Sequence, residues 1–178
     1  MAIKRVIQSR ASEGEDWDDA FLHRKAISVD TINDEILNVI QDLRDTLWAY
    51  PFCLGLSAPQ IGSKYAISVV NPSREATDND LVLINPKIIT LSGKKDRKRE
   101  SCMSVWDKMG EVERRGKIVL EYRDIDFQVR QINFSGFEAR VVQYELDHLE
   151  GILYSDRLYE GSTLQKADFF DGYVIINN

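Results

Sequence analysis

The segment QYELDHLEG, Gln143–Gly151, carries the pattern from which the fold can be worked out. In this segment and just before it, apolar side chains recur at the spacing of an amphipathic helix: Val141, Val142, Leu146 and Leu149. The sequence therefore predicts a helix from about Phe137 to Glu150. Gly151 is placed to end it, because glycine is common just past the C-terminus of a helix.

This predicted helix carries polar side chains of the kind found at metal centres. Tyr144 and His148 are four residues apart, so they point the same way from a helix, and Glu145 lies beside them. A His-Glu-x-x-His helix supplies two metal ligands and a carboxylate that can move a proton, and here Tyr144 stands at the first histidine position. Alone, Glu-x-x-His is a common pattern, and its simpler interpretation is a solvated Glu145 beside a His148 at the edge of the core.

Outward from this helix, the chain predicts a mixed α+β fold. Helical spacing of apolar residues predicts a second helix over Thr31–Trp48, with Thr31 as its N-terminal cap. Residues 11–20 are acidic and predict a solvated loop, and Arg123–Asp126 predicts the turn of a hairpin. The β-rich segments predict these strands: Tyr65–Val70, Leu81–Thr90, Lys117–Tyr122, Phe127–Ile132 and Tyr173–Ile176. Strands grouped around two separate helices favour α+β over alternating βαβ units, in a single domain over residues 1–178.

Composition narrows the class of protein further. The 178 residues are 43% hydrophobic, enough for a packed core, and the net charge of -6 argues against a protein that coats nucleic acid, including DNA. No apolar run approaches the roughly 18 residues of a membrane span, so we expect no membrane partner.

The counts of cysteine and histidine limit the kind of site. Two cysteines, Cys53 and Cys102, are too few for a disulfide framework, so we expect a reducing, cytoplasmic setting. The two histidines, His23 and His148, exclude a metal site built on three imidazoles. We expect His23, which precedes the first long helix, to be a surface or packing residue.

Two further segments accompany the helix motif in a fixed order. They are CLGLSAPQIG, Cys53–Gly62, and ESCMSV, Glu100–Val105. With Gln143–Gly151 they resemble the three motifs of peptide deformylases: Gly-x-Gly-x-Ala-Ala-Pro-Gln-x-Gly, Glu-Gly-Cys-Leu-Ser and Gln-His-Glu-x-Asp-His-Leu-x-Gly. The likeness continues through residues 110–124, so it covers most of the chain. It implies antiparallel β-sheets around a central helix that bears the third motif, plus an N-terminal helix.

The resemblance also implies an activity and a set of roles. Deformylases remove the formyl group from the N-terminal formyl-methionine of new polypeptides, and they use a divalent metal, which here we expect to be Fe²⁺ or Zn²⁺. By position, Cys102 and His148 would be metal ligands, and Glu145 the general acid/base for the attacking water. Gln60 and the backbone N–H of Met103 would stabilise the oxyanion.

A second set of positions would bind the substrate. Gly55, with Leu56 and Ser57 beside it, would let the substrate backbone pair in strand-like fashion. Trp106, which stands where proline usually follows the second motif, would narrow the peptide cleft or form part of a different pocket.

Other positions depart from the motifs of that family. Cys53 and Ser101 replace glycines, Ser57 replaces an alanine, and Met103 replaces a leucine. Ser101 would restrict the backbone if glycine were needed there for its conformation.

The largest departure is Tyr144 at the place of a ligand histidine. Three outcomes follow: a phenolate that binds the cation, a neutral phenol beside a weaker site of two residues, or a protein without metal. We favour the last two, because the unperturbed pKa of tyrosine is about 10.

Three functions therefore compete. The first is a metal-dependent deformylase acting on formylated peptides or nascent chains, with activity reduced or lost through Tyr144. The second is an inactive homologue that binds a peptide or a protein in the old cleft, and the third is a metal-free thiol hydrolase using Cys102 and His148. The basic run Lys94–Arg99 would suit contact with ribosomal RNA, but a solvated hairpin tip is its simpler interpretation.

Overall fold

The computed structural model describes residues 2–11, 18–74 and 80–170, in which an antiparallel sheet curves around one buried helix. The helices are α1 (Asp19–Leu22), α2 (Asp34–Ala49) and α3 (Gly136–Leu149), with short 3₁₀ turns η1 (Ala58–Ile61), η3 (Tyr154–Arg157) and η4 (Asp168–Phe170). The strands are β1 (Gly55–Ser57), β2 (Ile67–Val70), β3 (Leu81–Cys102), β4 (Val105–Arg123), β5 (Val129–Ser135) and β6 (Gln165–Lys166).

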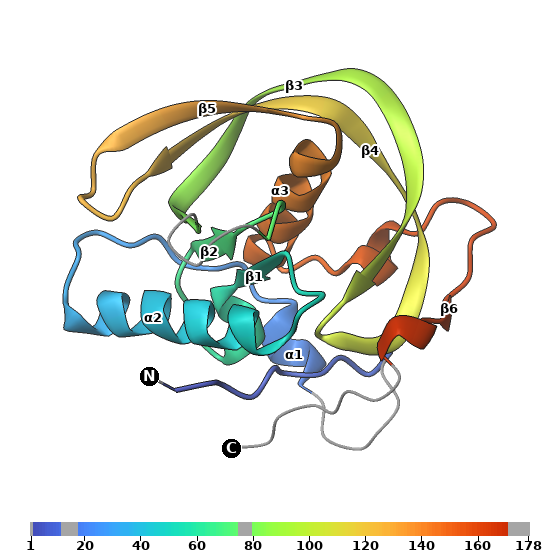
Figure 1. The fold of residues 1–178 in the computed structure, drawn as a ribbon, viewed down its shortest axis with the longest axis horizontal. Coiled ribbons are helices and arrows are strands. Elements are labelled where there is room, and N and C mark those ends of the chain that lie inside the picture. The colour runs from blue at the N-terminus through green and yellow to red at the C-terminus, as the bar shows by residue number, and fades with distance from the viewer. Residues whose placement is uncertain (1, 12–17, 75–79, 171–178) are drawn as a thin grey trace.

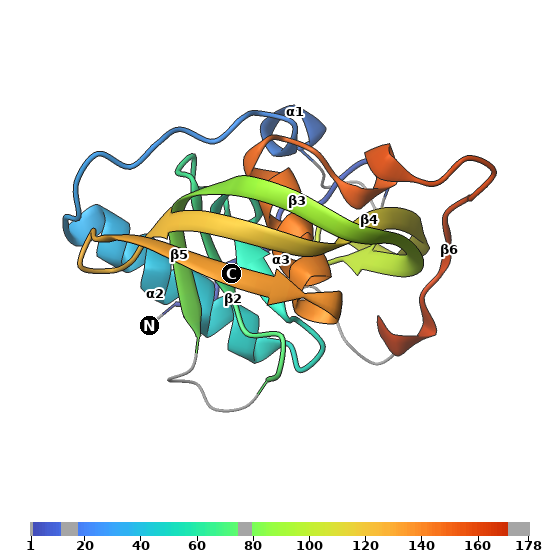
Figure 2. The same ribbon diagram turned by 90° about the horizontal axis from the view of Figure 1, so that it is seen from above.

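The strands of the described residues join in the order β1-β2-β3-β4-β5, and β6 pairs with β4. Each neighbouring pair is antiparallel. In Figure 1 the long strands β3 and β4, with β5, arch over α3, while α2 lies beneath β1 and β2. Figure 2 shows the same arch from above, with α3 enclosed behind it. The predicted α+β class is confirmed.

Both long helices were predicted, and their ends follow from the local chemistry. Helix α2 begins after Asn33, whose side-chain oxygen accepts a hydrogen bond from the Ile36 amide at 3.0 Å. The predicted cap, Thr31, is therefore wrong by two residues, since an Asn side chain performs the same function closer to the acidic first turn. Helix α3 ends at Leu149, and Gly151 follows with a φ of 73°, a left-handed conformation that favours glycine.

The strand predictions needed more correction. Strand β3 does not stop at Thr90 but continues to Cys102, so Lys94–Arg99 lies within a strand and is not a hairpin tip. Pairing with acidic residues of β4, such as Lys95 with Glu113 at 2.6 Å, supports the extended form of this charged run. The turn of this hairpin instead falls between Cys102 and Val105.

The remaining strands differ at their ends. Strand β5 starts at Val129 because Phe127 has a φ of 62° and belongs to the turn after β4, which confirms the predicted hairpin. Strand β2 begins at Ile67, whereas Tyr65 makes only an isolated bridge to Ile27. The elements α1, β1 and β6 were not predicted, and the predicted strand Tyr173–Ile176 lies outside the described residues.

Helix α3 is buried on almost every side. Its apolar residues pack against β3, β4 and β5, and its opposite side faces β1 and η1. Several polar side chains of this helix are also buried: Arg140, Gln143, Glu145, Asp147 and His148. Buried charges need partners, so the polar residues of α3 mark the region to examine for function. Among the helices of the described residues, none has the length and apolar character needed to pass through a bilayer.

Candidate functional site

The centre of the candidate site joins the end of β3 to one face of α3. The sulfur of Cys102 lies 3.4 Å from Nε2 of His148, and both residues are almost fully buried. The Tyr144 hydroxyl hydrogen bonds to the same sulfur, and its ring meets the His148 ring edge-to-face with centroids 5.0 Å apart. The i, i+4 spacing on α3 therefore brings Tyr144 and His148 together around Cys102, as the sequence predicts.

Glu145 lies beside this centre and is held by the first motif. Its Oε2 accepts a hydrogen bond of 2.6 Å from the Ser57 hydroxyl, and Ser57 Oγ also lies 2.8 Å from the Ser68 hydroxyl. A Cβ added to Gly55 would fall 2.6 Å from Glu145 Oε1, so the carboxyl group packs directly on the glycine backbone. Gly55 is therefore needed here for close approach and not for an unusual backbone angle.

Gln60 supplies an amide donor to the same centre. Its Oε1 accepts from the Ser57 amide at 2.9 Å, which orients the side chain. Its Nε2 then lies 3.3 Å from the Ser104 hydroxyl and 3.7 Å from the Cys102 sulfur. Gln60 belongs to the turn η1, in which Pro59 is the second residue and has a fixed φ.

Burial determines the charge state of these groups. It raises the pKa of the Glu145 carboxyl to about 8, against the opposing hydrogen bond from Ser57. It raises the pKa of the Cys102 thiol to about 12 and lowers the pKa of His148 to about 3. Burial and the nearby Cys102 and Glu145 hold the pKa of Tyr144 well above its ordinary value. The side chains thus prefer their neutral forms until a cation or a substrate changes the field.

A cavity of about 170 Å³ opens onto this centre. Gly55, Gln60, Met103, Tyr144 and Glu145 all lie in its wall. Most of the remaining wall is apolar, from Phe52, Leu54, Phe137, Val141 and Phe170, and its charged members besides Glu145 are Arg99, Glu100 and Arg140.

Three of the predicted substrate-binding residues lie behind this wall. Leu56 is fully buried in the core, and the Ser57 hydroxyl donates a hydrogen bond to Glu145. Trp106 packs against Phe52 and Phe170, with ring centroids 6.2 and 4.6 Å apart, and so supports two aromatic residues of the wall. Ser101 lies in the cavity wall without a left-handed backbone angle, so serine fits there without strain.

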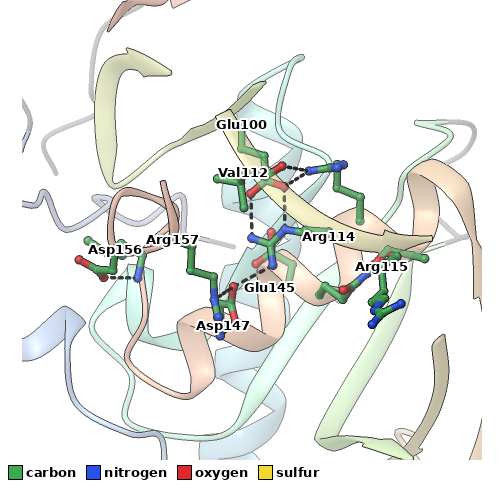
Figure 3. Close-up of polar contacts among 12 residues, drawn as sticks. Glu100, Val112, Arg114, Arg115, Glu145, Asp147, Asp156 and Arg157 are labelled. Carbon is green, nitrogen blue, oxygen red and sulfur yellow. Dashed lines mark hydrogen bonds and ion pairs between the residues drawn. The ribbon is translucent and has the colours of Figure 1, made fainter. Parts of the chain in front are cut away.

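A buried ion network, shown in Figure 3, fixes the two elements that carry the centre. Arg114 of β4 donates two hydrogen bonds to Glu100, at 2.6 and 2.7 Å, and one to Asp147 at 2.8 Å. Arg140 also contacts Glu100 at 2.6 Å, and Arg157 contacts Asp147 at 2.7 Å. Glu100 is two residues before Cys102 and Asp147 is next to His148, so Arg114 ties both halves of the site together.

Sequence reasoning did not find this network. The available signal was charge on the buried helix, where Arg140 and Asp147 interrupt an otherwise apolar pattern. Their partners, Glu100 for Arg140 and Arg114 for Asp147, lie far away in the chain, and local spacing cannot show such contacts.

Cys102 and His148 lie at a distance that suits the binding of a divalent cation. Two ligands of one tetrahedral zinc, a sulfur and a nitrogen, lie about 3.5 Å apart, close to the 3.4 Å between Cys102 and His148. No atom of the described residues hydrogen bonds to the buried Nδ1 of His148. Across residues 2–11, 18–74 and 80–170, however, no three His, Cys, Asp or Glu side chains gather in a metal-binding arrangement. Cys102 and His148 therefore fit a cation, while Tyr144, whose hydroxyl hydrogen bonds to Cys102, takes the place of a third ligand.

His23 takes no part in this centre. Its Nδ1–H donates to the Asp19 carbonyl, 2.8 Å away, and its Nε2 lies 3.2 Å from Asp156. It therefore links α1 to η3 as a packing residue near the surface.

Comparison with known proteins identifies relatives of this arrangement. The model of the family described as polypeptide deformylase matches residues 15–163. Peptide deformylase of Thermomicrobium roseum is 38% identical over 170 residues, covering 93% of this chain and 91% of that protein. Peptide deformylase 2 of Vibrio cholerae is 42% identical over 123 residues, covering 69% of this chain and 72% of that protein.

Solved structures agree with these sequence relatives. The crystal structure of peptide deformylase from Thermotoga maritima matches with a TM-score of 0.79 and 25% identity, covering 89% of this chain and 99% of that one. A plant peptide deformylase matches with a TM-score of 0.79 and 30% identity, covering 90% and 83%. With its centre built from the same three segments that the sequence singled out, the chain belongs to the polypeptide deformylase family.

Proposed function

We propose that this chain is a deformylase-type amide hydrolase that acts on N-formylated peptides, at a rate reduced by Tyr144. The observation that carries the proposal is the convergence of Cys102, His148, Glu145 and Gln60 on one cavity wall or directly behind it. Peptide deformylases are metal-dependent, and Cys102 with His148 are the residues that would hold the cation here. When bound, a divalent cation supplies Lewis acidity that activates water and polarises the formyl oxygen.

The side chains of the chain itself divide the remaining work. Glu145 is placed to take a proton from the attacking water and to return it to the leaving amine, and a carboxyl with a pKa of about 8 suits both steps near neutral pH. Ser57 holds one oxygen of Glu145 and leaves the other on the side of Gly55 and the cavity.

Gln60 and Met103 would stabilise the negative charge that develops on the formyl oxygen. The Gln60 amide points its Nε2 toward Cys102 and is oriented by the Ser57 amide, so it needs little reorganisation when charge appears. Met103 lies in the cavity wall next to Cys102, where its backbone N–H would be the second donor.

Tyr144 is the reason for a reduced rate in this proposal. The family motif places histidine at this position, and a phenol whose pKa is raised donates to Cys102 instead of offering a lone pair on a neutral nitrogen. A site with two strong protein ligands would hold the cation more weakly than a site with three.

The experiment is formate release from formyl-Met-Ala-Ser by the protein loaded with Fe²⁺ or Zn²⁺ without oxygen. We expect slow, metal-dependent release that falls at least about 100-fold in Glu145→Gln, since a positioned general base contributes 10²–10⁴-fold. Release that is absent in the loaded protein, or equal in Glu145→Gln, would overturn the proposal.

A second function is favoured by the contact between Tyr144 and Cys102. This hydrogen bond completes the centre without a cation, which suits a peptide-binding homologue without catalysis. The same assay separates the two functions, because such a protein would bind the formyl peptide and release no formate.

A thiol hydrolase is disfavoured, since a Cys102 pKa of about 12 leaves almost no thiolate at neutral pH.

A further inference from the structure

The mouth of the cavity carries a cation that the proposed reaction does not use. Arg99 of β3 lies in the cavity wall, and its side chain is exposed. Other basic residues of the same strand are engaged: Lys95 and Arg97 pair with Glu113, and Lys98 pairs with Asp96. Arg97 also stacks on the Tyr159 ring, 3.3 Å from its centroid.

Arg99 has no such engagement among the described residues. Its cross-strand neighbour on β4 is Glu111, yet the two side chains form no ion pair within 4.0 Å. Its guanidinium therefore keeps its donors available at the cavity mouth.

The other charged residues of the cavity wall already have partners. They are Arg140, Glu100 and Glu145: Arg140 contacts Glu100 at 2.6 Å, and the Ser57 hydroxyl donates to Glu145 at 2.6 Å. Glu100 is also bound by Arg114, so among the described residues of the wall Arg99 is the charged side chain that has no such partner. An anion at the mouth would meet the Arg99 guanidinium beside apolar residues of the wall such as Phe137, Val141 and Phe170.

We propose that Arg99 determines specificity by selecting peptides that carry a carboxylate in the residues just after the first. The apolar residues of the wall take the first side chain, and the Arg99 guanidinium binds the carboxylate through charge-assisted hydrogen bonds. This inference rests on the proposed function, which sets the direction in which the peptide enters the cavity. It concerns binding, so its test does not depend on turnover.

The test measures the affinity of two peptides, formyl-Met-Asp-Asp-Ala-amide and formyl-Met-Asn-Asn-Ala-amide, by titration calorimetry. The amide ends leave the aspartate side chains as the only difference in charge. We expect the metal-loaded wild-type protein to bind the Asp peptide about fivefold or more tightly, from one charge-assisted hydrogen bond, and the preference to shrink with added salt.

Two variants complete the experiment. Arg99→Gln should lose the preference, while Lys94→Gln, an exposed residue of the same strand outside the cavity wall, should keep it at the same net charge. Both positions are exposed, so circular dichroism should show both variants folded. Equal affinities in the wild-type protein, or a preference that survives in Arg99→Gln, would overturn the proposal. The catalytic proposal would stand in either case, because it is tested by formate release.

Discussion

At the scale of single residues, one substitution changes the character of the centre. Sequence reasoning placed Tyr144 and His148 on one face of a helix, and the structure confirms that both meet Cys102. The sequence could not show that the Tyr144 hydroxyl would donate to Cys102, because that contact depends on where strand β3 ends. The raised pKa of Tyr144 follows from its burial and its acidic neighbours, so the phenol stays neutral.

Replacing Tyr144 by His should strengthen the cation site. An imidazole adds a third strong ligand where the phenol now donates to sulfur, so we expect tighter Zn²⁺ binding, by about tenfold or more, and faster formate release. Competition with a chromogenic chelator measures the affinity. Tyr144→Phe is the control, since it removes the hydroxyl without adding a ligand. If affinity and rate in Tyr144→His equal those of the wild-type protein, the ligand assignment is wrong.

Gly55→Ala tests the contact between the first motif and Glu145. The new Cβ would lie 2.6 Å from Glu145 Oε1 and 2.8 Å from its Cδ, so the buried carboxyl must shift. We expect formate release to fall more than about tenfold and the unfolding free energy to drop by about 1–3 kcal/mol, as in overpacked cores. Kinetics and chemical denaturation measure the two effects, and an unchanged rate would show that Glu145 is not constrained as described.

At the scale of elements, prediction worked where the pattern was local. The helical period predicted α2 and α3 because each buries one continuous set of apolar side chains. Strand β3 was cut short because its basic run looked like a solvated turn, although acidic partners on β4 stabilise it as a strand. The three-residue β1 was missed because it is defined by pairing with β2, which short sequence windows do not reveal.

The network centred on Arg114 should be the main electrostatic tie between β4 and α3. Arg114→Met leaves Glu100 and Asp147 with fewer partners while they remain buried, so we expect a loss of about 3 kcal/mol in unfolding free energy. Urea denaturation measures it. Arg130→Met, which breaks an exposed pair with Asp124, is the control and should have a much smaller effect. Equal effects of the two substitutions would contradict the role assigned to the buried network.

At the scale of the whole molecule, contacts between distant segments close the fold around α3. His23, beside α1, contacts Asp156 in η3, and its backbone carbonyl lies against Gly151 at the end of α3. Partial burial lowers the pKa of His23, but the Asp19 carbonyl and the Asp156 carboxylate outweigh it, so the pKa is raised overall. The sequence indicated a packing residue, and only the fold reveals its partners.

This raised pKa predicts a pH-dependent contribution to stability. Because the folded protein holds the His23 proton more tightly than the unfolded chain, the stabilisation is present below about pH 6.5 and is lost as pH rises through the folded pKa. His23→Gln should therefore destabilise the protein by less than about 1 kcal/mol at pH 5.5, and by almost nothing at pH 8.5. Denaturation at both pH values measures this. Lys25→Gln breaks a nearby exposed pair with Glu150 and should show no such dependence.

The most direct test of the central claim is the metal content of the protein, purified without oxygen or chelator and measured by elemental mass spectrometry. If Cys102 and His148 hold a divalent cation, the wild-type protein saturated with metal contains about one ion of iron, zinc or nickel per chain. The Cys102→Ser variant treated in the same way does not. A folded wild-type protein that remains metal-free under these conditions would contradict the account. The cavity would then be a peptide-binding site without hydrolysis.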